Sequence, residues 1–158
     1  MQYRSLVLIV SLGISLVACA GVQHKSDKPA EKIMGSEIID GWAKIAKNDN
    51  LQLTAYADPA SIQWYGNRAS ILTMNDYSIQ RPTPDRSNTF MSEKVLKLYD
   101  CETSKSQVGK ISMYSGNMGK GDTTVWESGR GQQFDWNRVD PGKIDYDFLK
   151  FVCAKKPK

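Results

Sequence analysis

The sequence predicts an α+β fold, a compact antiparallel β-sheet of about five to six strands packed by one C-terminal α-helix. Three observations predict it: short alternating segments from residue 41 onward, turn residues between those segments, and a last segment whose apolar residues follow a helical period. The chain has 158 residues, of which 41% are hydrophobic, and this is enough for one domain with its own core.

The first two predicted strands are residues 42–46 and 51–58. In the second, every other residue from Leu51 to Ala57 is apolar, which is the pattern of a half-buried antiparallel strand. The sequence Asn-Asp-Asn at 48–50 predicts a turn between them, because Asn and Asp tolerate left-handed backbone angles and bond their own backbone.

A hairpin is predicted at Gly66-Asn67, with its second strand running from about Arg68 to Tyr77. The stretch 78–90 contains two prolines and no periodicity, so it is predicted to be a mobile loop. Strand character returns at 91–103, continues at 108–116 after a polar turn, and ends in a short strand at Thr123–Trp126.

The C-terminal segment predicts one helix of about three turns. Asp140 can cap it and Pro141 fits its first turn. Asp145 and Asp147 are interpreted as acids that favour the first half of this helix through its dipole, rather than as an acid–base pair. One helical stripe carries the apolar residues Ile144, Phe148, Leu149 and Val152.

The N-terminus has the pattern of a signal peptide. Arg4 is the positive charge, residues 5–17 form the apolar stretch, and small residues follow. An uncleaved anchor helix is the alternative, but the apolar stretch of about a dozen residues is shorter than the roughly 20 that a spanning helix needs. Residues 1–18 are therefore predicted to be removed.

The sequence Leu16-Val17-Ala18-Cys19 resembles the bacterial lipobox. This resemblance implies that Cys19 carries diacylglycerol on its thiol and acyl chains on its new amino group, and an anchor with more than one chain holds a protein firmly on a membrane. Because Ala20 is not the aspartate that favours inner-membrane retention, the resemblance also implies the outer membrane, with the periplasmic or surface face left undetermined.

Residues 19–40 are predicted to be the lipidated cysteine and a flexible tether, and residues 41–158 the domain. The tether is polar and is interrupted by Pro29 and Gly35. Ile38-Ile39 near its end leaves room for a short helical turn or a docked strand.

Two cysteines remain once Cys19 is lipidated. In an oxidising compartment, Cys101 and Cys153 are expected to form a disulfide that closes a loop of roughly 53 residues and contributes about 4 kcal/mol. Two buried free thiols are the alternative. A metal site is a weaker interpretation because structural sites usually take four ligands, and we expect neither a metal nor a cofactor.

The mature chain resembles the surface-adhesin protein E family of Gram-negative bacterial lipoproteins over most of residues 41–154. The resemblance implies an antiparallel sheet packed by a helix, a disulfide between Cys101 and Cys153, and, as in its best-known members, adhesion to host extracellular-matrix and serum proteins. It also carries over the Asp140-Pro141-Gly142 helix start, but no ligand-binding surface. The matching features are Trp42, "ADPASI" (57–62), "YGNRASI" (65–71), "YDCET" (99–103), Tyr114, "WNRVDPG" (136–142) and "FVC" (151–153).

Several functions are disfavoured by composition and motifs. The net charge is +4, with 21 basic and 17 acidic residues spread along the chain, which is not the clustered pattern of a nucleic-acid binder. The one histidine, His24, lies in the tether, and no nucleophile is seen beside a base, so an enzyme is not expected. "GNMGKGD" (116–122) lacks the ending of a phosphate-binding loop.

Four tryptophans are the remaining candidates for ligand contact. Trp42 and Trp136 are predicted to belong to the core, with Trp126 partly covering the sheet. Trp64 and Tyr65 beside the hairpin turn are predicted to be the exposed ligand-binding pair.

Two functions are consistent with these features. The first is an adhesin-like outer-membrane lipoprotein that binds host extracellular-matrix or serum proteins, with a sheet edge that could add a partner strand or pair with a second copy to form a homodimer. The second is a periplasm-facing structural or accessory envelope lipoprotein without a host ligand.

Overall fold

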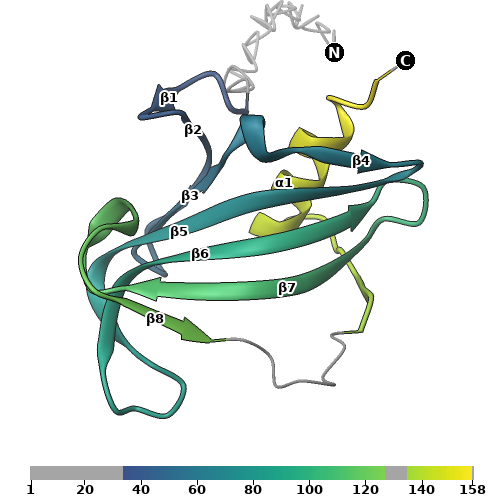
Figure 1. Cartoon of the computed structure of the whole chain (residues 1–158). Coiled ribbons are helices and arrows are strands. Elements are labelled where there is room, and N and C mark those ends of the chain that lie inside the picture. The colour runs from purple at the N-terminus through teal and green to yellow at the C-terminus, as the bar shows by residue number, and fades with distance from the viewer. Residues whose placement is uncertain (1–33, 127–134, 158) are drawn as a thin grey trace, which may run out of the picture. The chain divides into compact units, whose positions relative to one another are not determined.

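Antiparallel strands form most of the domain, which a computed structural model describes for residues 34–126 and 135–157, except for the side chains of residues 124–126. Residues 1–33, with the predicted signal peptide and Cys19, lie outside the described residues. Figure 1 shows one sheet with a single α-helix across one of its faces. The elements are β1 (Ile38–Ile39), β2 (Trp42–Asn48), β3 (Leu53–Ala57), β4 (Gln63–Tyr65), β5 (Arg68–Pro82), β6 (Thr89–Asp100), β7 (Lys105–Tyr114), β8 (Thr123–Trp126), β9 (Asn137–Arg138), the 3-10 turns η1 (Pro59–Ser61) and η2 (Asn117–Gly119), and α1 (Ile144–Cys153).

The sheet of the described residues has nine strands, all paired antiparallel, in the order β1-β2-β3-β5-β6-β7-β8. β4 pairs with β5, and β9 pairs with β7. The α+β class is as predicted, but five to six strands was too low a number. β1 and β9 have two residues each, and such short pieces carry no measurable alternation in a sequence.

The core lies between the sheet and α1. Alternate residues of β5 face the helix, and Ala69 and Ile71 are completely buried there. From the helix, the predicted stripe is confirmed: Phe148, Leu149 and Val152 are buried, and Ile144 packs against the core. The other core residues are Ala43, Ile45, Ala55, Ala57, Tyr99, Val139 and Phe151.

α1 begins later than predicted. Asp140 does not cap it and Pro141 is not in its first turn, because Lys143 is the N-cap residue and the helix starts at Ile144. Gly142 has a φ of +81°, a left-handed conformation that a right-handed helix cannot contain, so the helix cannot extend back to Pro141.

Asp145 attaches α1 to the sheet through three donors. The Lys97 ammonium forms an ion pair with Oδ1 at 2.5 Å, the Tyr99 hydroxyl donates to Oδ1 at 2.7 Å, and the Ser106 hydroxyl donates to Oδ2 at 2.6 Å. Burial alone raises the pKa of Asp145, but the charge of Lys97 and these hydrogen bonds together lower it below its ordinary value. Burial and the neighbouring Asp145 carboxylate raise the pKa of Tyr99.

The predicted loop at 78–90 was too long, because residues 78–82 and 89–90 belong to strands. β5 continues to Pro82, β6 starts at Thr89, and only residues 83–88 connect them. The register shifts between Asp76 and Arg81 before pairing resumes. This irregularity hides the alternation, and Pro82 is tolerated because it is the last residue of its strand.

Residues just before β2 are docked on the sheet. The Gly35 amide donates to the Lys44 carbonyl at 3.0 Å and the Lys44 amide donates to the Glu37 carbonyl at 2.9 Å. Met34 packs against the core. Of the two possibilities for Ile38-Ile39, the docked strand is the one found, as β1.

Candidate binding surface at the disulfide end of the sheet

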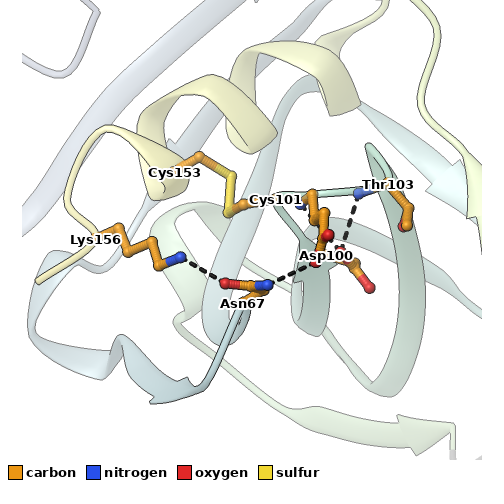
Figure 2. The surroundings of a disulfide bond; sticks show 7 residues. Asn67, Asp100, Cys101, Thr103, Cys153 and Lys156 are labelled. Atoms are coloured by element: carbon orange, nitrogen blue, oxygen red, sulfur yellow. Dashed lines mark hydrogen bonds between the residues drawn. A yellow bond between two sulfur atoms is a disulfide. The ribbon is translucent and has the colours of Figure 1, made fainter.

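Three elements meet at one end of the sheet: the β4–β5 hairpin, the β6–β7 connection and the end of α1. Figure 2 shows Cys101 and Cys153 joined there, with a Cα–Cα distance of 5.7 Å. Cys101 directly follows β6 and Cys153 is the last residue of α1, and this is the pair expected from the sequence. The disulfide therefore joins the end of the helix to the end of β6, an interior strand of the sheet.

Asn67 in the hairpin turn bonds to both elements that carry the cysteines. Its carbonyl accepts from the Cys101 amide at 3.0 Å, and its side-chain Nδ2 donates to Glu102 Oε2 at 2.6 Å. Its Oδ1 accepts from the Lys156 ammonium at 2.6 Å, beyond the end of the helix (Figure 2). The tip of the hairpin is held on both sides.

Asp100 organises the connection after β6. Its Oδ1 accepts from the amides of Glu102 and Thr103, both at 3.1 Å, and its Oδ2 accepts from Arg68 Nε at 3.1 Å. The hydrogen bond from the Thr103 amide is the largest cause of a lowered pKa of Asp100, with further lowering by Arg68 and Glu102. The same Arg68 guanidinium lies 4.9 Å from the centre of the Trp136 ring.

The predicted pair Trp64 and Tyr65 is divided between two faces. Trp64 is opposite Ala69 and packs against the core on the helix side, whereas Tyr65 is opposite Arg68 and is 62% exposed. The Tyr65 hydroxyl donates to Gln63 Oε1 at 2.8 Å. Adjacent residues of a strand point to opposite faces, so the two cannot form one contact surface.

In the structure Arg68, not Trp64, lies beside Tyr65, and Arg68 in turn contacts Trp136. We define the corner surface as Tyr65, Asn67, Arg68 and Trp136. Arg68 could be found from the sequence, because a two-residue turn at Gly66-Asn67 places it opposite Tyr65. No local signal marks Trp136, which is far away in the chain.

The predicted core positions of Trp42 and Trp136 were wrong, since both are half-buried. Trp42 lies outside the core cluster, and the Lys94 ammonium lies 5.5 Å from its ring centre and 4.9 Å from that of Tyr114. These two rings and Lys94 belong to different strands, which only the folded sheet brings together. The side chain of Trp126 lies outside the described residues.

The described residues contain neither a metal-binding cluster nor a membrane-spanning helix. Among residues 34–126 and 135–157, no group of three or more His, Cys, Asp or Glu side chains is arranged to hold a metal ion. Within those ranges there is also no helix with the length and apolar character to cross a bilayer.

The fold and the corner surface define the class: a small antiparallel-sheet domain whose C-terminal helix is joined by one disulfide to the residue after β6, beside the tip of the β4–β5 hairpin. The chain belongs to the surface-adhesin protein E family, whose profile matches residues 42–154.

Solved structures of Haemophilus influenzae protein E have the same fold. One superimposes with a TM-score of 0.57 at 16% identity, over 75% of this chain and 90% of that one. A second crystal form gives a TM-score of 0.58 at 16% identity, over 75% and 91%. At this identity the likeness concerns the fold.

One curated protein also matches, over a short segment. The catalytic subunit of DNA-dependent protein kinase from Dictyostelium discoideum is 47% identical over 36 residues. This match spans 23% of the present chain and 1% of that protein, so it carries no argument about function.

Proposed function

We propose that this protein is an outer-membrane lipoprotein whose domain binds extended host extracellular-matrix or serum proteins through the corner surface. The observation that carries the proposal is an exposed Tyr65 beside an Arg68 that is stacked on Trp136. Tyr, Arg and Trp are the residue types that dominate the energy of protein interfaces. Membership of an adhesin family supports the same function.

Rigidity is the second support. The backbone that carries Tyr65 and Arg68 is held by the Asn67 hydrogen bonds and lies beside the disulfide. A surface that is already ordered loses less conformational entropy when it binds a partner. The Arg68 side chain is 57% exposed although it bonds Asp100, so it can contact a partner without leaving its place.

The test is binding of the soluble Cys19→Ala chain to immobilised laminin and vitronectin by surface plasmon resonance. Tyr65→Ala and Arg68→Ala should each raise Kd by about tenfold or more, as expected for residues at the centre of an interface. Leu51→Ala is the control, because Leu51 is also exposed, at 48%, but lies in the turn between β2 and β3.

Two results would contradict the proposal. If neither protein shows saturable binding, the proposed adhesin function is wrong. If Tyr65→Ala and the parent chain have equal Kd values, the corner surface is not the binding site. The alternative function, a periplasm-facing accessory lipoprotein, is separated by protease treatment of intact cells, because only a surface-exposed domain is cleaved without permeabilisation.

Pairing of a sheet edge with a second copy, named from the sequence as one use of that edge, stays a prediction. Ile38 and Ile39 are 56% and 36% exposed on the short edge strand β1. Exposed apolar residues on an edge strand favour pairing with another strand.

A further inference from the structure

An open cavity of about 430 Å³ lies at the other end of the sheet. It is bounded by the turn between β2 and β3, by one row of side chains across three strands, and by Asn117 of η2. The register forms the row, since Lys47 is opposite Thr54 and Thr54 is opposite Asp76. Its volume is in the range of small-ligand pockets, roughly 300–1,000 Å³.

The cavity is separate from the corner surface. Thr54 lies between Leu53 and Ala55 in β3, and Ala55 is in the core beneath the helix, so the row lies on the face of the sheet away from the helix, which is also the face of the corner surface. Asp76 is eight positions beyond Arg68 in β5, a separation of about 26 Å. Substitutions at one site therefore do not touch the other.

Hydrogen bonds hold the walls of the cavity in place. Asn117 Nδ2 donates to Asp76 Oδ1 at 3.1 Å and to the Tyr77 carbonyl at 2.8 Å, and the Met118 amide donates to Asp76 Oδ1 at 2.7 Å. On the other side, the Ser78 amide donates to the Gln52 carbonyl at 2.9 Å. The shape of the cavity is thus present before any ligand binds.

Two polar groups in this cavity are left unused by the protein. Asp76 accepts its hydrogen bonds at Oδ1, and within the described part of the chain neither Asp76 Oδ2 nor the Gln52 side-chain amide has a partner. Gln52 also has a φ of +49°, where Gly or Asn would be less strained. This strained backbone conformation places the side-chain amide of Gln52, which is both a donor and an acceptor, at the cavity.

The charged side chains that line the cavity indicate which class of ligand it can bind. Lys47 is neutralised by Asp49, whose Oδ1 lies 2.6 Å from Nζ, and Asp76 adds a further carboxylate. A polyanion is repelled by these acids, and two carboxylates do not make a metal site. Carboxylate and amide groups placed together instead match the alternating donors and acceptors of neighbouring hydroxyl groups.

We propose that this cavity binds a neutral saccharide, with Asp76 Oδ2 accepting from ring hydroxyls and the Gln52 amide bonding to an adjacent one. This site does not depend on protein binding at the corner surface. The saccharide could belong to a host glycoprotein or to the envelope of the bacterium, and the shared chemistry is that of a hydroxyl-rich ring.

The test is nuclear magnetic resonance of the ¹⁵N-labelled, soluble Cys19→Ala chain, titrated separately with chitotriose and with lactose to millimolar concentration. We expect saturable shifts of the backbone amides of Gln52, Thr54, Asp76, Ser78 and Asn117, and none at Arg68. A response to chitotriose alone indicates N-acetylglucosamine chains such as those of a cell wall, and a response to lactose alone indicates galactosides.

Gln52→Ala should weaken that binding by at least about fivefold, the loss of one hydrogen bond, and leave the rest of the spectrum unchanged. Gln80→Ala is the matched control, because Gln80 lies two residues beyond Ser78 in β5 and is also exposed but does not line the cavity. No shift with either sugar, shifts centred elsewhere, or an unchanged affinity of Gln52→Ala would each overturn the proposal.

Discussion

At the scale of single residues, Asp145 shows how one carboxylate can hold two elements together. It forms an ion pair with Lys97 and accepts hydrogen bonds from Tyr99 and Ser106, and these residues belong to the neighbouring strands β6 and β7. Its neighbour Asp147 makes no such contact within the described residues. The sequence interpretation, that both acids act through the helix dipole, therefore leaves out the main role of Asp145.

Asp145→Asn should lower the free energy of unfolding by about 3 kcal/mol, because it leaves the half-buried Lys97 ammonium without its counter-charge. Asp147→Asn is the matched control in the same turn and should cost only about 0.5 kcal/mol through the helix dipole. Urea denaturation at neutral pH measures both. Equal losses in the two variants would show that the contacts of Asp145 contribute nothing beyond the dipole.

The stabilisation by Asp145 should also depend on pH. Its pKa is lower in the folded chain than in the unfolded one, so its contribution is complete above the unfolded value of about 4 and is lost as pH falls toward the folded value. The difference in unfolding free energy between the parent chain and Asp145→Asn should shrink when denaturation is repeated between about pH 4 and about pH 2. A difference that stays constant over this range contradicts the assignment.

At the scale of elements, the strand boundaries depend on contacts that are distant in the chain. β5 continues through Pro82 because β6 lies beside it. The start of α1 at Ile144 is the exception, because the left-handed Gly142 turns the backbone locally just before it. The segment before β2 is ordered as far back as Met34 by its bonds to Lys44 and by the helix. Each boundary differs from what local composition indicates.

Two glycines test whether residue 35 packs against the helix. Both Gly35 and Gly41 have positive φ, +79° and +85°, so alanine is strained at either position. An added Cβ at Gly35 overlaps the Phe151 ring, but at Gly41 it meets nothing within 4 Å. Gly41→Ala should cost about 1 kcal/mol and Gly35→Ala about 3 kcal/mol in unfolding free energy, from strain and overpacking.

Thermal unfolding followed by circular dichroism provides the measurement. If Gly35→Ala and Gly41→Ala have the same Tm, the segment before β2 is not packed on α1, and the domain begins later than its contacts indicate.

The disulfide should be the largest single covalent contribution to stability. Replacing Cys101 and Cys153 together by alanine opens a loop with a sequence separation of 52 and should lower the free energy of unfolding by about 4 kcal/mol in the chain-entropy model. Guanidinium denaturation compares the double variant with the parent chain. A loss below about 1 kcal/mol would show that the Asn67 hydrogen bonds and the core hold this corner without the disulfide.

At the scale of the whole molecule, the sheet presents one face to the helix and two separate features on the other. The corner surface lies at the end with the disulfide and the polar cavity at the opposite end, so the two proposed sites share one face of the sheet.

Membrane attachment is the prediction that belongs to the whole chain. Cys19→Ala should move the protein from the membrane fraction to the soluble fraction and abolish labelling with a radioactive or clickable fatty acid, because the lipid chains are the expected anchor. Cys101→Ala is the control, since that thiol is in the disulfide and should not affect attachment. Labelling that persists in Cys19→Ala would mean that the lipobox is not used.

Much of the fold could be predicted because it is encoded in local pattern. Alternation in residues 51–58, the Gly66-Asn67 turn, and the helical stripe of Phe148 and Val152 are signals within a few residues, and the structure contains the matching elements. The pairing of Cys101 with Cys153 follows from a count, once Cys19 is assigned to the lipid.

The sequence by itself thus determined the fold class, most of the strands, the position of the helix and the family resemblance. Only the tertiary structure decided that Tyr65 shares a face with Arg68 rather than with Trp64, that Arg68 contacts Trp136, that Asp145 bonds three donors, and that Lys47, Thr54 and Asp76 line one cavity. The physical reason is that alternation and turn chemistry act between neighbours in the chain. Strand register and sheet curvature instead place side by side residues whose spacing in the sequence carries no signal.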